Sequence, residues 1–411
     1  MHSEFRTVSV VGLGYIGLPT AATIASRGID VVGVDVSQKA VSAINEARAH
    51  FSEPDLDGLV HSAVVGGRLK AFTAPQPADA FIVAVPTPVR PDKSPDMAFV
   101  EQASRAVAAV LKPGDLVILE STSPVGTTEW MGGLIREERP DLVDGDGLKI
   151  SMAYCPERIL PGRMVYELVQ NDRIVGGLTP ACAARAKALY ATFVRGSIYE
   201  TSAAVAELVK LIENAYRDVN IAFANEVANI CERMGLDAWE AIGLANKHPR
   251  VNILNPGPGV GGHCIAVDPW FVIAQHPDLT PLMQAARGIN DGRPASVIDK
   301  VRAAAGARGT RRVAALGLAY KPDVDDLRES PALEIAGHLA DEGFEVLVAE
   351  PNVQELPAVL AGRANVRLVE TEAAIAGSDI AVLLVGHAPF RQVEAAALKG
   401  KDVIDCVGLW R

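Results

Sequence analysis

One cysteine stands where a covalent reaction could take place. Cys264 lies in the stretch NPGPGVGGHCIAVDPWF, directly after Gly261, Gly262 and His263, and Asp268 follows four positions later. Small neighbours give a substrate carbon and a cofactor access to the sulfur, and a loop that runs into a helix lowers a thiol pKa. Asp268 would lie one helical turn away, where it could orient a base. The alternative is a buried, inert thiol. It suits the other cysteines better: Cys155, Cys182, Cys231 and Cys406.

A second set of polar residues interrupts an apolar helical pattern. Lys210, Asn214 and Arg217 are spaced by four and three positions, so a helix would place them on one face. A partly desolvated lysine can act as a general acid or base near neutral pH. The asparagine could hydrogen-bond a hydroxyl or a water, and the arginine suits phosphate or carboxylate. An ordinary solvated helix face would carry the same residue types.

Two further polar groups follow predicted strands. Glu157 and Arg158 come after Pro156 in AYCPERILPG, and Lys321 and Arg328 follow the strand that opens the last third of the chain. The two basic side chains of the second group suit anions. A surface turn and solvated loop charges are the alternative interpretations.

A glycine-rich turn lies near the start of the chain. Gly12, Gly14 and Gly17 have G-x-G-x-x-G spacing between a strand and a helix, which is typical of dinucleotide binding. Asp35 ends the next strand, where a carboxylate accepts ribose hydroxyls and repels a 2′-phosphate, so the pattern favours NAD over NADP. The alternative is a merely tight turn and a surface acid. Thr87 and Thr122 follow two later strands, where they could contact the nicotinamide half or act as caps.

Composition excludes several classes of protein. The chain has 411 residues, a net charge of −11, 49% apolar and 22% charged residues, which argues against disorder. Acidity and 5% aromatic residues argue against nucleic-acid binding, and charges interrupt every apolar run of membrane-spanning length. The five scattered cysteines lack metal-site spacing, so we expect no metal and reduced thiols in the cytoplasm.

Short apolar runs alternate with helical patterns at both ends of the chain, which predicts an α/β protein with parallel sheets. An uninterrupted helical pattern of about 30 residues begins near 202, and a second helical stretch covers 281–305. We therefore expect two Rossmann-like doubly wound domains joined by a central helical domain with a long helix. The boundaries are 1–200, 201–307 and 308–411. The apolar flank of the long helix predicts a dimer surface. The strands are predicted at 7–11, 30–34, 80–85, 116–119, 149–154, 197–199, from 312, 345–349, 380–385 and 403–406.

Together these motifs resemble the UDP-glucose/GDP-mannose dehydrogenase family over essentially the whole chain. They occur in the family's order: GLGYIGLP, VAVPTP, STSPVGTT, ELVKLIEN, GGHCIAVDP and GLAYKPDVDDLRES. Other stretches, such as YCPERILPG, are most similar to the branch that acts on UDP-N-acetyl-D-mannosamine to make a uronic acid for bacterial surface polysaccharide.

The resemblance implies an NAD-binding first domain, a dimerising middle domain and a last domain that contacts UDP. It implies Cys264 as the nucleophile, Lys210 as the acid/base, and Asn214, Asp268 and Glu157 as groups that position water and substrate. The remaining residues it assigns to the nucleotide sugar are Arg158, Ile159, Arg217, His248, Arg250, Gly261 and Lys321, besides Lys210 and Asn214. Those it assigns to NAD, besides the glycines, are Tyr15, Ile16, Asp35, Thr87, Thr122 and Arg328. It also implies that Arg250 can come from the partner subunit of a homodimer.

The chemistry so implied is a four-electron oxidation of a primary alcohol at sugar C6 through a thiohemiacetal and a thioester on Cys264. The substrate could instead be UDP-N-acetylglucosamine, UDP-glucose or GDP-mannose. A two-electron β-hydroxyacid-type dehydrogenase shares the first domain and the Lys-x-x-x-Asn helix but has no use for the cysteine. A nucleotide-sugar-binding module without turnover is the third hypothesis.

Overall fold

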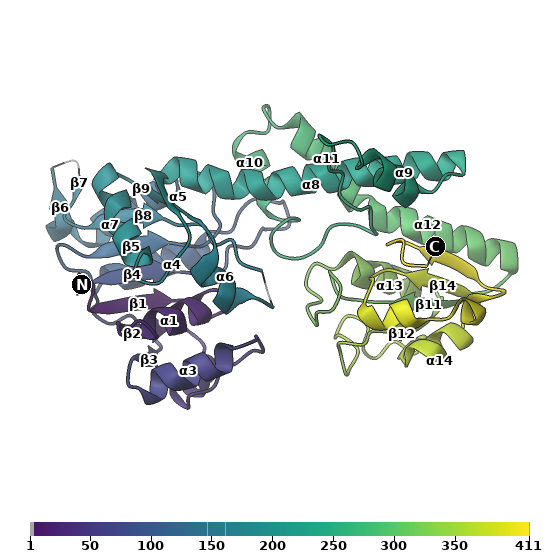
Figure 1. The fold of residues 1–411 in the computed structure, drawn as a ribbon, viewed down its shortest axis with the longest axis horizontal. Coiled ribbons are helices and arrows are strands. Elements are labelled where there is room, and N and C mark those ends of the chain that lie inside the picture. The colour runs from purple at the N-terminus through teal and green to yellow at the C-terminus, as the bar shows by residue number, and fades with distance from the viewer. Residues whose placement is uncertain (1–3, 146, 161, 411) are drawn as a thin grey trace. The chain divides into compact units, whose positions relative to one another are not determined.

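The computed structural model describes residues 4–145, 147–160 and 162–410 and separates into two compact units. The first comprises residues 1–212 with 270–275, and the second comprises 213–269 with 276–411. Each contains a Rossmann-like sheet, and the long helix α8 (Ala203–Met234) runs from one unit into the other (Figure 1). The expected class, two α/β domains joined by a helical middle with a long helix, is confirmed.

In the described part of the first unit, eight strands form a sheet in the order β10-β9-β8-β5-β4-β1-β2-β3. Because β1 lies between β4 and β2, the chain changes direction across the sheet at the carboxyl end of β1, where open α/β sheets bind ligands. The strands are β1 Thr7–Val11, β2 Asp30–Val34, β3 Leu69–Phe72, β4 Ala80–Val83, β5 Leu116–Leu119, β8 Ser151–Tyr154, β9 Arg173–Gly177 and β10 Ile198–Ser202.

Helices pack on both faces of this sheet, so its strands are apolar throughout. In β5, Leu116 and Ile118 join the cluster that includes α1 and α7, whereas Val117 and Leu119 join the cluster that includes α4 and α5. The helices are α1 Gly17–Ala25, α2 Gln38–Asn45, α3 Leu56–Val65, α4 Ala98–Ala108, α5 Thr127–Glu138, α6 Met164–Gln170 and α7 Pro180–Tyr190. A two-stranded hairpin, β6 Val143–Asp144 and β7 Gly147–Leu148, extends after α5.

The last two strands of this sheet differ from the expected arrangement. β8 pairs with β9 in antiparallel fashion, and β9 with β10 in parallel, so these two strands oppose the rest of the sheet. The connection from β8 to β9 contains the turn at Glu157 and the short helix α6.

In the described part of the second unit, five parallel strands have the order β13-β12-β11-β14-β15. These strands are β11 Arg312–Leu316, β12 Glu345–Ala349, β13 Val366–Leu368, β14 Ile380–Leu383 and β15 Asp402–Asp405. The helices of this sheet are α12 Arg293–Arg308, α13 Pro331–Asp341 and α14 Thr371–Ala376. The middle region of the chain also contains α9 Ala238–Ala245, α10 Asp268–Gln275 and α11 Pro281–Asp291, and residues 270–275 of α10 belong to the first unit.

The helical stretch expected at 281–305 is two helices. α11 ends at Asp291 and α12 begins at Arg293, with Gly292 as the joint. Pro294 cannot donate the backbone hydrogen bond that would continue the first helix through this point, so the chain starts a new helix there. Among the described residues, no helix is both long and apolar enough to span a membrane.

Candidate active site

The glycine turn after β1 is closed by contacts that exclude side chains. Gly12 has φ +92°, and a Cβ there would lie 2.4 Å from the carbonyl oxygen of Ala84. A Cβ at Gly17 would lie 1.7 Å from the carbonyl oxygen of Gly12, so strand and helix pack here without space for a methyl group. At Gly14, by contrast, a Cβ would meet no heavy atom of the described chain within 4 Å. The turn therefore offers open space beside backbone N–H groups at the start of α1, as a pyrophosphate requires.

Asp35 lies at the end of β2 and faces this turn. Its carboxylate accepts hydrogen bonds from the backbone N–H groups of Leu13 at 2.9 Å and Ser37 at 2.8 Å. The side chain is half-buried, so these bonds fix its orientation while part of it faces solvent. Ile16 precedes α1, and the Tyr15 ring is largely exposed, with its centroid 4.5 Å from that of Phe51. Together with the open space at Gly14, this arrangement fits NAD.

A serine that the motifs did not single out joins the two threonine loops. The Ser121 hydroxyl, at the end of β5, accepts from the Val85 N–H at 2.9 Å and donates to the Val85 carbonyl at 2.7 Å. It thereby ties the loop that carries Thr87 to the loop that carries Thr122, and both threonines are half-buried at the carboxyl edge of the sheet. Sequence offered no signal beyond its place next to Thr122.

Glu157 is anchored in a buried ion pair. Its Oε2 lies 2.9 Å from Nη1 of Arg173, and both side chains are almost fully buried. Its Oε1 accepts from the N–H groups of Arg158 at 2.6 Å and Ile159 at 2.8 Å, so the carboxylate shapes the turn that carries those residues. Arg158 and Ile159 are themselves half-buried. These contacts make Glu157 a residue that holds the turn, and Arg173 is its previously unrecognised partner.

A second buried carboxyl group lies beside this ion pair. Glu120, the residue after β5, accepts a hydrogen bond of 2.5 Å from the Tyr190 hydroxyl. Burial, and secondly the negative charge of Glu157, raise the pKa of Glu120 to about 7, against the opposing effect of Arg173. Glu120 can therefore hold a proton at neutral pH, which reduces the cost of two carboxyl groups near one guanidinium.

The first turns of α8 are tied to the loop after β5. Glu207 is buried and accepts from the N–H of Gly126 at 2.7 Å and from the N–H and hydroxyl of Thr128 at 2.8 and 2.7 Å. Burial raises the pKa of Glu207. Lys210 lies one turn further along α8 and is 9% exposed, so its side chain is nearly buried.

Asn214 and Asp268 meet in the second unit. The Asn214 side-chain amide donates to Oδ2 of Asp268 at 2.5 Å, and both side chains are buried. Asp268 begins α10, and its backbone N–H donates to the carbonyl of Cys264 at 2.8 Å. The cysteine, the aspartate and the asparagine that we predicted for one centre are thus linked within this unit. Arg217, three positions after Asn214, is exposed.

Cys264 differs from the other cysteines in its environment. It is exposed, whereas the other four are buried, and burial raises the pKa of Cys155 and of Cys406 to about 12. The interpretation of Cys264 as an inert core thiol is therefore wrong for this structure.

The glycines before the cysteine have a role that spacing did not indicate. A Cβ at Gly261 would lie 2.4 Å from the carbonyl oxygen of Glu329, and at Gly262, with φ +81°, it would lie 2.8 Å from the Tyr320 ring. The loop packs against residues 320–331 at backbone distance, which holds it in place. Arg328 belongs to that segment and donates to the carboxylate of Asp326 at 2.8 and 2.7 Å.

His248 and Arg250 lie together in the exposed loop after α9. The Arg250 N–H donates to Nδ1 of His248 at 3.3 Å, and both side chains are exposed.

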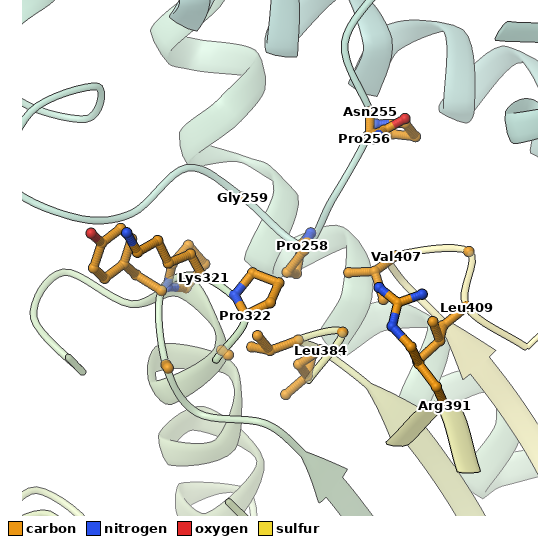
Figure 2. A pocket seen from close by; sticks show the side chains of 17 residues that line it. Asn255, Pro256, Pro258, Gly259, Lys321, Pro322, Leu384, Arg391, Val407 and Leu409 are labelled. Atoms are coloured by element: carbon orange, nitrogen blue, oxygen red, sulfur yellow. The ribbon is translucent and has the colours of Figure 1, made fainter. Parts of the chain in front are cut away.

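A cavity of about 380 Å³ opens at the carboxyl edge of the second sheet. Its lining joins Asn255 and Gly259, from the loop before Cys264, to Tyr320, Lys321 and Arg391. In Figure 2, Lys321 lies at one side of an apolar floor of prolines and leucines, and Arg391 lies at the other. Two cations around an apolar floor suit a molecule with a flat base and phosphates. Lys321 was expected here, whereas Tyr320 and Arg391 were not.

The first turn of the second sheet repeats the backbone geometry of the NAD turn. Gly317 has φ +91°, and Oε2 of Glu350, after β12, accepts from the Leu318 N–H at 2.7 Å, as Asp35 does from Leu13. Here, however, Nε2 of the buried His387 also donates to Oε2 at 3.0 Å. Burial opposes ionisation, but the bonds from His387 and the backbone outweigh it and lower the pKa of Glu350.

Among the residues that the structure describes, no group of three or more His, Cys, Asp or Glu side chains is arranged to hold a metal ion.

Comparison with known proteins finds relatives over nearly the whole chain. Profiles of the UDP-glucose/GDP-mannose dehydrogenase family match the chain at 6–194 (NAD binding domain), 204–292 (central domain) and 314–411 (UDP binding domain). The chain is 53% identical to a UDP-N-acetyl-D-mannosamine dehydrogenase of Yersinia pestis, over 99% of this chain and all of that one. It is also 53% identical to an NDP-N-acetyl-D-galactosaminuronic acid dehydrogenase of Ralstonia nicotianae, over 99% and 97%. The solved structure of a UDP-D-ManNAc dehydrogenase from Pyrococcus horikoshii superposes with TM-score 0.90 at 38% identity, covering 98% of this chain and 96% of that chain.

Proposed function

The chain belongs to the UDP-glucose/GDP-mannose dehydrogenase family and is an NAD-dependent nucleotide-sugar dehydrogenase, and on that premise we propose that it oxidises C6 of UDP-N-acetyl-D-mannosamine to the carboxylate. The supporting observation for the substrate is similarity over nearly the full length to dehydrogenases of that sugar. A relative named for N-acetyl-D-galactosaminuronic acid has the same sequence identity to this chain, 53%. UDP-N-acetylgalactosamine is therefore the second candidate substrate.

The exposed thiol of Cys264 carries the chemical part of this proposal. NAD, held at the turn of Gly12 and Asp35, supplies the hydride acceptor for both oxidations when it is bound. The C6 alcohol first becomes an aldehyde, and its hydroxyl proton passes to a base, the role we assign to Lys210. The Cys264 sulfur then bonds to the aldehyde carbon as a thiohemiacetal. A second oxidation gives a thioester, which water cleaves to the acid and the free thiol.

The other residues of this scheme have separate proposed tasks. Asn214, held by Asp268, donates to the oxygen that becomes negative during thiol addition and thioester hydrolysis. Glu157 shapes the turn of Arg158 and Ile159, which we assign to the sugar nucleotide. The other residues that we assign to the nucleotide sugar are Arg217, His248, Arg250, Gly261 and Lys321. For each molecule of sugar, two NAD⁺ and one water give two NADH, one carboxylate and three protons.

We further propose a homodimer that pairs through α8. Seven apolar side chains on one face of this helix are 40–65% exposed, at intervals of three, four and seven positions. A long exposed apolar stripe is typical of an interaction surface. They are Val205, Leu208, Ile212, Tyr216, Phe223, Ile230 and Met234. We assign Arg250, exposed in the loop after α9, to the active site of the second copy.

Each of the three predicted domains has its own proposed role. We assign NAD binding to 1–200, dimerisation to 201–307 and UDP-sugar binding to 308–411. We also propose a cytoplasmic enzyme of surface-polysaccharide synthesis, consistent with five cysteines that form no disulfide in the described part of the chain.

The test is a substrate panel with the amount of NADH measured per sugar. UDP-N-acetyl-D-mannosamine should yield two NADH per molecule, and the N-acetylgalactosamine, N-acetylglucosamine and glucose analogues and GDP-mannose far less activity. Cys264→Ser should stop before acid is released, whereas Cys231→Ser, at a buried thiol, should leave the stoichiometry at two. A yield of one NADH, unchanged by Cys264→Ser, would instead indicate a two-electron dehydrogenase. Absence of NADH with every sugar would indicate a binding module.

A further inference from the structure

Both backbone groups of Gly257 are held by buried side chains. Its N–H donates to Oδ1 of Asn225, on α8, at 2.9 Å, and its carbonyl accepts from Nε of Arg293, on α12, at 2.9 Å. Asn225 and Arg293 are 0% and 4% exposed. Arg293 also donates to the side chain of Asn229. A loop residue that directs both its backbone groups into a protein interior needs such partners, because an unpaired buried group is costly.

The two side chains are themselves fixed from behind. The Asn225 amide donates to Oδ1 of Asn290 at 2.9 Å, and the Asn290 amide donates to Oδ1 of Asp218 at 2.8 Å. Asp218 pairs with the buried Arg287 at 2.6 Å. A continuous chain of hydrogen bonds thus runs from Gly257 through α8 to α11, and burial makes each bond in it stronger than it would be in water.

The same loop is held a second time, four residues earlier. The side-chain amide of Asn246 accepts from the Ile253 N–H at 2.7 Å and donates to the Ile253 carbonyl at 2.9 Å. Two of the residues that line the cavity, Asn255 and Pro256, lie between these two anchored positions. The following ones, Pro258 and Gly259, come directly after the second anchor. The wall of the cavity is therefore positioned by side chains that do not line it.

We infer that Asn225 and Arg293 are positioning residues for nucleotide binding, which act by holding Gly257 so that the wall from Asn255 to Gly259 keeps the shape that receives UDP. The inference rests on the proposed function, since it takes the cavity as the UDP site. It adds two residues of the helical region, outside the cavity, to those that determine affinity for the nucleotide. Preorganisation of this kind lowers the cost of binding, and its loss weakens binding without removing a contact to the ligand.

The experiment measures UDP affinity by calorimetry together with melting temperature. Asn225→Ala removes the bond to Gly257, and we expect it to raise the Kd for UDP about ten-fold. The KM for the UDP-sugar should rise similarly, whereas the KM for NAD⁺ should stay within about two-fold of its original value. Arg293→Lys keeps the charge but lacks the planar fork, so it should fall between Asn225→Ala and the original protein. If Asn225→Ala does not fold, the UDP affinity of Arg293→Lys is compared with that of the original protein instead.

Asn365→Ala is the matched control. Asn365 also makes two side-chain hydrogen bonds within the second unit, to the carbonyls of Ala340 at 2.7 Å and Phe344 at 2.9 Å, and it does not line the cavity. This variant should melt earlier, much as Asn225→Ala does, while binding UDP as tightly as the original protein. Equal UDP affinity of Asn225→Ala and the original protein would overturn the inference alone. If the original protein did not bind UDP at all, the assignment of the cavity would fail and the inference with it.

Discussion

Asp268 joins the thiol loop to the long helix: its carboxylate accepts from Asn214 at 2.5 Å, and its N–H donates to the carbonyl of Cys264 at 2.8 Å. The side-chain bond sets the orientation of the Asn214 amide, and the backbone bond starts α10 directly after the cysteine. One buried residue therefore controls both the hydrogen-bond donor and the loop that carries the nucleophile.

Replacing Asp268 should separate catalysis from substrate binding. In Asp268→Asn the buried carboxylate becomes an amide that offers a donor as well as an acceptor, so Asn214 loses its fixed orientation. We expect kcat to fall about 100-fold with KM values changed less than about three-fold. Steady-state assays of NADH formation check this, with Asp278→Asn, at an exposed acid in the same unit, as control. A KM effect as large as the kcat effect would assign Asp268 to binding instead.

Thiol reactivity should follow the burial of the cysteines. In the native protein, a thiol reagent such as DTNB at pH 8 should modify one cysteine quickly, because Cys264 is exposed. Burial raises the pKa of Cys155 and of Cys406 to about 12, so both thiols stay protonated at this pH. Denaturation should release all five. Cys264→Ser should abolish the fast reaction, and Cys182→Ser should leave it intact. Fast labelling that persists in Cys264→Ser would contradict the structure.

Stability should fall as pH rises through the ionisation of Glu120. Burial raises its folded-state pKa to about 7, above the value of 4.5 for an ordinary glutamate, so the folded protein holds the proton over a range in which the unfolded chain has lost it. The stabilisation is complete below about pH 4.5 and is lost as pH approaches and passes 7. A shift of this size corresponds to about 3 kcal/mol.

Glu120→Gln tests this because the amide keeps the bond to Tyr190 and cannot ionise. Relative to this variant, the free energy of unfolding of the original protein should decrease between pH 5 and pH 8 in urea titrations. Glu137→Gln, at an exposed position, should follow the original protein at both pH values. A constant difference between the Glu120→Gln variant and the original protein across this range would show that Glu120 is ionised throughout.

Choice of cofactor should depend on Asp35 and not on its strand. Asp35→Ala removes the carboxylate that Leu13 and Ser37 orient, so we expect the KM for NAD⁺ to rise about 30-fold and discrimination against NADP⁺ to shrink. Asp30→Ala lies at the other end of β2, where its partner is the exposed Arg68, and should leave both KM values unchanged. Retained discrimination in Asp35→Ala would place the ribose elsewhere.

Mixing two inactive variants should decide where Arg250 acts. If Arg250 serves the active site of the second copy, a mixed dimer of Arg250→Ala and Cys264→Ser has one intact site. Random exchange of subunits should then restore about a quarter of the original activity, since half the dimers are mixed and each has one of two sites. Phe223→Asp, in the exposed face of α8, should prevent this recovery and give monomers in light scattering. If the mixture regained no activity, Arg250 would act in the active site of its own subunit.

The fold was largely predictable because its strands are buried on both faces and read as apolar runs. β1, β2, β5 and β12 begin and end at the predicted residues. The break at Gly292 had a local signal, since Pro294 stands two positions later and no helix continues through it unaided. The opposite direction of β9 and β10 had none, because pairing direction depends on how the chain returns from the Glu157 turn.

In the candidate site, residue types were predictable and partners were not. Cys264, Asn214 and Asp268 were recognisable from their setting, and the structure links them. Arg173 and Glu120 were not, because the bonds that define them join residues 16 and 70 positions apart along the chain. The arginine is the first residue of a strand and the glutamate directly follows one, and only the folded sheet shows what each one contacts.

The contact between Glu350 and His387 also sets a limit on what the second sheet can bind. A sugar ring that approached Gly317 as it would approach Gly12 would find its acceptor already occupied, with Oε2 shared among two backbone N–H groups and an imidazole and Oε1 turned to Asn352. The turn at Gly317 therefore has a structural role. The second sheet therefore cannot hold a ribose between its first turn and its acidic residue, which distinguishes it from the first sheet.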